Sequence, residues 1–136
     1  MPVHIQPYDH WDARNYAYTL PVYMQPNDPL VAEVLKVAGK FANEKGCSMY
    51  GYQGRSRESV KIQAEAIYKA LQEMDLHYIS SPASFETSGQ KIRIPRRVLH
   101  EKSKQGTCLD LAMLYATCLE AASLNSVIIV ISGHAF

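Results

Sequence analysis

A cysteine and a histidine in the last third of this 136-residue chain are the residues best suited to covalent chemistry. Cys108 follows Gly106 and Thr107, and His134 follows the apolar run at residues 127–131. An imidazole beside a thiol can take its proton, and the resulting thiolate attacks carbonyl carbons. The two residue types therefore predict a thiol nucleophile, Cys108, served by a general base, His134.

The residues around Cys108 predict that it begins a helix. Thr107 is a favoured N-cap, and Asp110 stands three residues later, as in a capping box. The apolar residues that follow predict a buried helix from Cys108 to about Leu124. Unpaired amides and the helix dipole at such an N-terminus favour a thiolate and can stabilise an oxyanion.

The lengths of the two following segments predict that His134 returns to the level of Cys108. A helix over residues 108–124 rises about 24 Å at 1.5 Å per residue. If Asn125 and Ser126 form a turn, an extended segment over residues 127–134 runs back by about 24 Å at 3.3 Å per residue. We expect an interior strand at residues 127–131, because they are all apolar and β-branched.

Three side chains are candidates for a donor to the oxyanion. Gln105 is close to Cys108 in sequence, whereas Tyr52 and Gln53 lie in a glycine-rich segment. The sequence gives no geometric reason to choose among them. The other two cysteines, Cys47 and Cys118, are interpreted as packed residues.

The remaining chain predicts two long helices followed by shorter elements. The first helix begins after Asp28, with Pro29 as its first residue, and ends near Gly46. The second is capped by Ser56 and carries an apolar stripe with charged residues opposite. We expect a short strand at residues 77–79, a polar loop at 80–90, an extended segment at 92–94 and a short helix at 96–102.

These elements indicate an α+β fold that is mostly helical, with an incomplete antiparallel sheet. Residues 1–27 form an arm rich in aromatic residues and prolines, which we expect to cover the core without much regular structure. Residues 28–136 form the domain that carries Cys108 and His134.

Composition limits the class of protein. The net charge of +1 argues against nucleic-acid binding, and we interpret the basic residues between Lys91 and Lys104 as a solvated face. No apolar run is long enough to span a membrane, and no secretory signal is recognisable. Three unrelated cysteines favour a reducing compartment, hence the cytoplasm. The spacing of cysteines and histidines predicts no metal and no other cofactor.

The motif around Cys108, the helix after it and the Gly133-His134-Ala135 segment together resemble the core of the transglutaminase-like superfamily. Residues 82–86 and 92–99 resemble a bacterial branch whose domains occur in multidomain proteins. The resemblance covers roughly residues 56–136. It implies a papain-like thiol enzyme with a Cys-His-Asp triad, in which Cys108 attacks an amide of a protein or peptide substrate and His134 is the base.

The resemblance also implies that the third triad residue, an acid, would follow on a further strand. We therefore expect a fragment truncated at its C-terminus and weak or inactive by itself, with the edge at residues 127–131 covered by a partner chain or a second copy. The alternative is a non-catalytic protein-interaction module of the same fold. The sequence leaves open the substrate and the choice between hydrolysis and acyl transfer.

Overall fold

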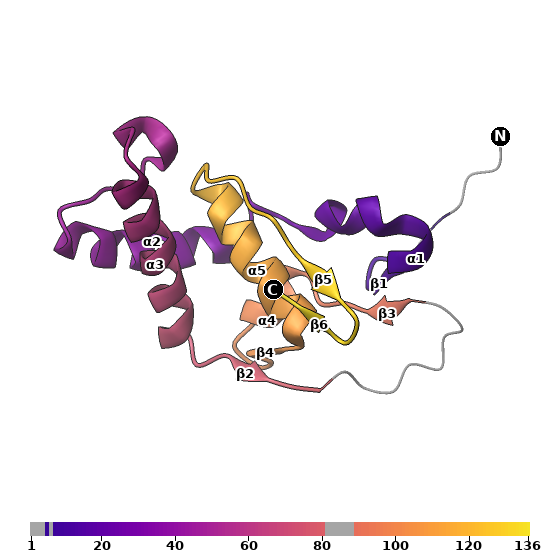
Figure 1. Cartoon of the computed structure of the whole chain (residues 1–136). Helices are drawn as coiled ribbons and strands as arrows, with labels where there is room; N and C mark the ends of the chain where they lie inside the picture. The colour runs from indigo at the N-terminus through magenta and orange to yellow at the C-terminus, as the bar shows by residue number, and fades with distance from the viewer. Residues whose placement is uncertain (1–4, 6, 81–88) are drawn as a thin grey trace.

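A computed structural model describes residues 5, 7–80 and 89–136 of the chain. Three helices dominate it: α2 (Pro29–Glu44), α3 (Arg57–Glu73) and α5 (Cys108–Ala121). Helix α5 lies in the middle of the molecule, with α2 and α3 packed together on one side of it and the N-terminal segment on the other (Figure 1). The short helix α4 (Pro95–Leu99) packs against α2 and α5.

The ends of the long helices follow from local hydrogen bonds. The Asp28 carboxylate accepts from the Leu30 amide at 2.9 Å, and the Ser56 hydroxyl accepts from the Ser59 amide at 3.0 Å. Gly46 follows α2 with a φ of +67°, which glycine adopts without a steric penalty. Both predicted N-caps and the predicted stop are confirmed.

The main core forms where α2, α3, α4 and α5 meet. Val34, Ile67, Val98, Leu114 and Cys118 are completely buried in it. The apolar residues of α2 that recur at helical spacing, Leu30, Val34, Val37 and Phe41, predict one buried face, but Val31 and Ala38 are buried and Val37 and Phe41 are only partly so. The small residues of α2 face its neighbours because they allow helices to approach closely.

The N-terminal arm has more regular structure than we expected. It forms β1 (His10–Trp11), α1 (Ala13–Tyr16) and the 3-10 helix η1 (Ala17–Tyr23). The Asp12 carboxylate caps α1 by accepting from the Arg14 and Asn15 amides at 3.0 and 3.3 Å. Trp11 and Leu20 are buried in a second apolar cluster with Leu109 and Met113 of α5. The arm therefore covers the core, as predicted, but it does so as short helices and a strand.

The strands do not form one incomplete antiparallel sheet. Among the described residues they form three two-stranded sheets. β1 pairs antiparallel with β3 (Gln90–Lys91), β2 (His77–Tyr78) pairs parallel with β4 (Gln105–Gly106), and β5 (Val130–Ile131) pairs antiparallel with β6 (His134–Ala135). The mixed composition agrees with the α+β class. The parallel pair was not foreseen, because it joins segments far apart in the sequence.

Two short elements are displaced from their predicted positions. The extended segment expected at residues 92–94 is a strand at Gln90–Lys91, and the helix expected at 96–102 is α4 at Pro95–Leu99. Pro95 is the first residue of α4, where its missing amide costs nothing. Residues 81–88, which include most of the predicted polar loop and the 82–86 motif, lie outside the described part of the chain.

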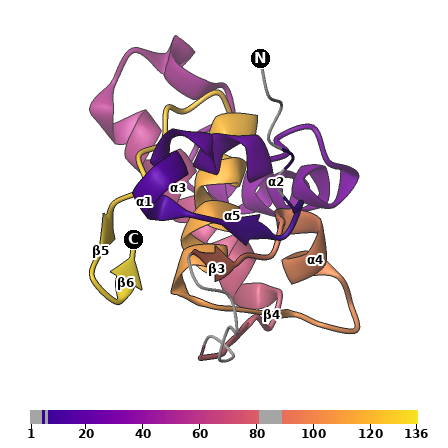
Figure 2. The same cartoon turned by 90° about the vertical axis from the view of Figure 1, so that its right-hand side faces the viewer.

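The apolar run at residues 127–131 is not an interior strand. Val127, Ile129, Val130 and Ile131 are exposed by 82, 56, 43 and 53%. The run enters the β5–β6 hairpin, which projects to one side of α5 (Figure 2). β-branched residues favour an extended backbone whether or not the strand is covered. The residue types of this run therefore did not determine whether it is buried.

The basic residues of 91–104 are not uniformly solvated. The Arg96 guanidinium donates to the buried Asp28 carboxylate at 2.6 Å, and Arg93 pairs with Asp110 at 3.1 Å. Arg96 therefore joins α4 to the N-terminus of α2, and Arg93 joins the segment before α4 to the N-terminus of α5.

In the part of the chain that the structure describes, no helix has the length and apolar character required to cross a membrane.

A buried glutamine links α3 to η2 (Gly51–Gly54), a feature that the apolar stripe did not predict. The fully buried Gln63 amide donates to the Gly51 carbonyl at 2.9 Å and to the Ser59 carbonyl at 3.1 Å, and its oxygen accepts from the Gly51 amide at 2.8 Å. The side chain thus satisfies both backbone polar groups of one buried glycine.

We expect Gln63→Leu to lower the free energy of unfolding by about 2 kcal/mol, because both Gly51 groups lose their partner. Denaturant unfolding measures this change. The exposed glutamine of the same helix provides the control, since Gln72→Leu should change stability by less than about 0.5 kcal/mol. Equal effects of the two substitutions would contradict the role given to Gln63.

Candidate active site at the N-terminus of α5

Cys108 is the first residue of α5, as predicted. The Thr107 hydroxyl accepts from the Asp110 amide at 3.3 Å, and the Asp110 carboxylate accepts from the Thr107 amide at 2.9 Å. This reciprocal pair is a capping box, and it fixes the backbone on both sides of Cys108. The Cys108 side chain is half-buried. The thiol is therefore held at a rigid helix end without being sealed in the core.

A buried ion pair reinforces this helix end. Asp110 is fully buried and accepts from the Arg93 amide at 2.7 Å and from the Arg93 guanidinium at 3.1 Å. With the Thr107 amide it therefore has three donors. The carboxylate is fully engaged at the helix cap, as the predicted capping box implies, so Asp110 does not orient His134. The pairing of Arg93 with Asp110 could not be predicted from the residues around either one.

His134 is not at the end of the strand that contains Val130, as we had expected, but begins the next one. Ser132 and Gly133 turn the chain, and Ile131 pairs with His134 across the hairpin. Gly133 has a φ of +79°, which favours glycine at this turn. The neighbouring Ala135 is buried in the second apolar cluster with Leu109, so β6 lies against α5. The exposed His134 ring makes an edge contact with Phe136 at a centroid distance of 4.7 Å.

Cys108 and His134 both line the same two cavities. The first, called the aromatic cavity, has about 450 Å³ and lies between α3, α5 and β6. The second, called the polar cavity, has about 310 Å³ and lies between β2, β3, the start of α5 and the hairpin. Tyr78 and Ala135 also line both cavities. Cys108 and His134 thus both lie where the two cavities adjoin.

The described residues contain no hydrogen bond between the Cys108 thiol and the His134 ring. They also contain no carboxylate that forms an ion pair with His134. His134 is anchored to α5 through its neighbour Ala135, and within the described chain its exposed ring has no polar partner. A proton-transfer contact often tightens only when substrate is bound, so the shared cavities are the relevant geometric observation.

Backbone amides provide the oxyanion donors that the geometry favours. The Asp110 amide is used in the capping box, and the Leu111 amide donates to the Thr107 carbonyl at 3.0 Å. Within the described chain, the amides of Cys108 and Leu109 have no hydrogen-bond acceptor. They are the first two amides of α5, beside the thiol, where an attacked carbonyl oxygen would develop negative charge.

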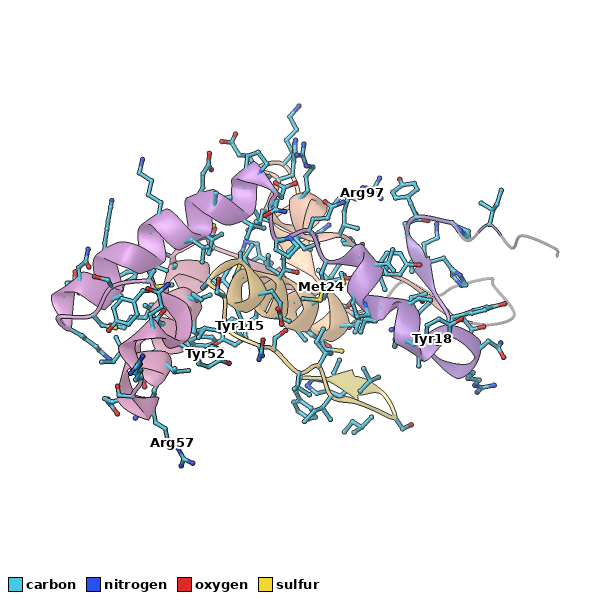
Figure 3. All side chains as sticks on the ribbon, turned by 90° about the horizontal axis from the view of Figure 1, so that it is seen from above. Tyr18, Met24, Tyr52, Arg57, Arg97 and Tyr115 are labelled. Atoms are coloured by element: carbon cyan, nitrogen blue, oxygen red, sulfur yellow. The ribbon has the colours of Figure 1, made fainter. Side chains whose placement is uncertain are left out.

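The structure separates two of the three oxyanion side-chain candidates from Cys108. Tyr52 and Gln53 belong to η2, and the Tyr52 hydroxyl accepts from the Asn125 amide at 3.0 Å, beyond the C-terminal end of α5. Helix α5 runs for 14 residues from Cys108 to this end, a rise of about 20 Å. Tyr52 lies with Arg57 at the end of the molecule opposite Tyr18 (Figure 3). The structure therefore does not bring Tyr52 and Gln53 together with Cys108.

Gln105 is close to Cys108 but is held by other contacts. It belongs to β4 and pairs with His77. The described linings of the two cavities include Cys108 and His134 but not Gln105. Its role as a donor remains a prediction, with less geometric support than the two backbone amides.

Sequence reasoning missed Tyr78 and Gln90 as residues of the site. Both line the polar cavity, Tyr78 from β2 and Gln90 from β3. The pairing of β2 with β4 and of β1 with β3 brings them there. No local pattern signalled these long-range pairs.

A further cavity of about 550 Å³ lies beside η1, lined by Tyr18 and Met24, and does not include Cys108 or His134.

The other two cysteines are buried, as predicted. Cys47 contacts the Ser59 carbonyl, with 3.7 Å between sulfur and oxygen, and Cys118 lies in the main core. Burial raises the pKa of the Cys118 thiol to about 12. In the described part of the chain, no group of three or more Cys, His, Asp and Glu side chains is arranged to hold a metal ion.

The raised pKa of Cys118 predicts a specific loss of stability at alkaline pH. Above about pH 8.5 the unfolded chain releases the Cys118 proton while the folded chain keeps it. The free energy of unfolding therefore falls by up to about 1.4 kcal/mol per pH unit from this group until the pH reaches its folded-state pKa. Cys118→Ala should reduce this slope between about pH 9 and pH 10.5 in denaturant unfolding. An unchanged slope would contradict the assigned pKa.

Comparison with known proteins gives no family for this chain. No protein-family model, no curated protein and no solved structure matches it.

Proposed function

We propose that the chain is a transglutaminase-like thiol hydrolase or acyltransferase domain that acts on an amide through Cys108 and His134. One observation carries the proposal: the two side chains line the same pair of cavities at the N-terminus of a buried helix. A helix N-terminus favours the thiolate, and the Cys108 and Leu109 amides, which have no acceptor in the described chain, are available to bind an oxyanion. The α+β core around α5 is the proposed transglutaminase-like core.

The proposed reaction has two half-reactions. His134 accepts the proton of Cys108, and the thiolate sulfur forms a bond to the carbonyl carbon of the amide. The Cys108 and Leu109 amides bind the developing oxyanion. His134 then returns the proton to the leaving amine as the C–N bond breaks, leaving a thioester on Cys108. Water or a second amine attacks this thioester and releases the thiol.

The described residues supply a Cys-His pair without an orienting carboxylate at His134. In analogous triads, loss of the acid costs orders of magnitude in rate. We therefore propose slow turnover, with a protein or peptide as substrate. Three free cysteines and a nucleophile that works only as a thiolate suit a reducing compartment, which we propose is the cytoplasm.

The decisive variant is Cys108→Ala. We expect it to abolish the hydrolysis of an activated ester, p-nitrophenyl acetate, because no other described thiol reaches the two cavities. Release of p-nitrophenolate at neutral pH measures the rate. Cys118→Ala is the matched control on the same helix and should retain the wild-type rate. Equal activity of the Cys108 variant and the wild-type chain would reject the proposal.

A second candidate function is supported by the exposed apolar hairpin. Val127, Ile129, Val130, Ile131 and Phe136 are all more than 40% exposed. Clustered exposed apolar residues mark protein interaction sites, which suits a non-catalytic interaction module whose partner is another protein or a second copy. This alternative gains weight if Cys108 proves unreactive towards activated esters.

A further inference from the structure

The aromatic cavity begins at the proposed nucleophile and continues along α5. Leu111, Ala112 and Tyr115 line it three, four and seven residues after Cys108, which places all four on one face of the helix. Leu71 and Tyr68 line it from α3. Tyr68 and Tyr115 form an edge-to-face pair with a centroid distance of 6.2 Å. Apart from Gln72, Cys108 and His134, the described lining of the cavity is therefore apolar or aromatic.

The cavity has no charged wall. Its described lining contains no Asp, Glu, Lys or Arg side chain. The Tyr115 hydroxyl already donates to the Ala64 carbonyl at 3.1 Å. A carboxylate or ammonium group placed there would lose its hydration without gaining an opposite charge.

The aromatic residues at the rim are incompletely covered. Tyr68, Tyr78 and Phe136 are exposed by 56, 63 and 60%. A bulky apolar group in the cavity would cover this surface and be stabilised by it. With a volume of about 450 Å³, the cavity lies within the range of small-ligand sites and has room for one aromatic or branched side chain.

We infer that the aromatic cavity binds a bulky apolar side chain on the acyl side of the scissile bond. The inference rests on the proposed function, because it takes Cys108 as the atom to which the acyl group is joined. The acyl group stays bonded to that sulfur between the two half-reactions, so its side chain must lie beside the start of α5. The polar cavity, with Ser80, Gln90 and Thr107, then faces the polar backbone of the substrate.

The test compares p-nitrophenyl esters of N-acetylated phenylalanine, leucine, glycine and glutamate. Each rate is divided by the rate of the same ester with free cysteine, which removes differences in intrinsic reactivity. We expect the phenylalanine and leucine esters to react roughly 10- to 100-fold faster than the glutamate ester, the scale on which an apolar pocket discriminates. Equal corrected rates, or a faster glutamate ester, would overturn the inference.

A pair of variants of α5 tests the location. Ala112→Phe fills the cavity and should remove most of the preference for the phenylalanine ester over the glycine ester. Ala121→Phe, at another half-buried alanine of the same helix, should leave the preference intact. Loss of preference in both variants, or in neither, would show that the cavity does not select the side chain.

A binding measurement tests this inference independently of the proposed function. If no ester acylates the wild-type chain, the proposed function fails while the cavity can still be tested. The Cys108→Ala chain should then show NMR shift changes at residues of the cavity with N-acetylphenylalanine amide and none with N-acetylglutamate amide. Shift changes elsewhere, or none with either compound, would overturn the inference without reference to catalysis.

Discussion

Replacement of His134 by alanine should slow acylation of Cys108 by about 10²- to 10⁴-fold, the usual contribution of a general base. His134 is the only histidine among the described residues that line the two cavities. Without its imidazole, proton transfer from the thiol depends on solvent. The release of p-nitrophenolate in the first turnover, measured by stopped flow, gives the acylation rate directly.

The fold should survive this substitution. His134 is exposed, and the hairpin is held by backbone pairing of Ile131 with residue 134 and by the buried Ala135. His100→Ala is the matched control, since that histidine is also exposed and follows α4, outside both cavities. If the two histidine variants acylate at the same rate, His134 is not the base.

Asp110→Ala should lower the free energy of unfolding by about 3–5 kcal/mol, more than Gln63→Leu or Thr107→Ala. The change leaves the Arg93 guanidinium, whose side chain is 26% exposed, without its buried partner. It also removes the acceptor for the amides of Arg93 and Thr107. Denaturant unfolding at neutral pH measures the loss.

Thr107→Ala separates the ion pair from the cap. It removes the hydroxyl that accepts from the Asp110 amide but leaves the Arg93–Asp110 pair, so it should cost only about 1 kcal/mol. An equally small loss for Asp110→Ala would mean that the buried pair contributes nothing beyond the cap.

The parts of the fold that were predictable are those fixed by local interactions. Asp28, Ser56 and Thr107 cap the helices that they were expected to cap, because a side-chain acceptor reaches an amide two or three residues away. The same argument placed Cys108 as the first residue of α5. The periodicity of α2 and α3 gave the helices, but only tertiary packing selected which face became most buried.

The parts that were not predictable depend on long-range pairing. Gln63 satisfies Gly51 across twelve residues, and Arg93 pairs with Asp110 across seventeen. Nothing in either neighbourhood indicates such a partner. The run at residues 127–131 was misassigned for a related reason: apolar type predicts a strand, but whether the strand is covered depends on which elements pack against it.

The geometry of the candidate site was predicted in part. The lengths of helix and strand brought His134 back to the start of α5, although by a hairpin and not by a single strand. Tyr52 and Gln53 were assigned from their glycine-rich segment alone, and η2 places them beyond the far end of α5. Tyr78 and Gln90 line the polar cavity beside Cys108, because β2 and β3 pair with distant strands.

The most direct measurement of the central claim locates the acyl group itself. The wild-type chain is treated briefly with p-nitrophenyl acetate at neutral pH, quenched in acid and mapped by peptide mass spectrometry. We predict one acetyl group on the peptide that carries Cys108, removed by hydroxylamine as a thioester should be. Acetylation confined to lysines or to Cys47, with an unmodified Cys108, would contradict the assignment of this helix end as an active site.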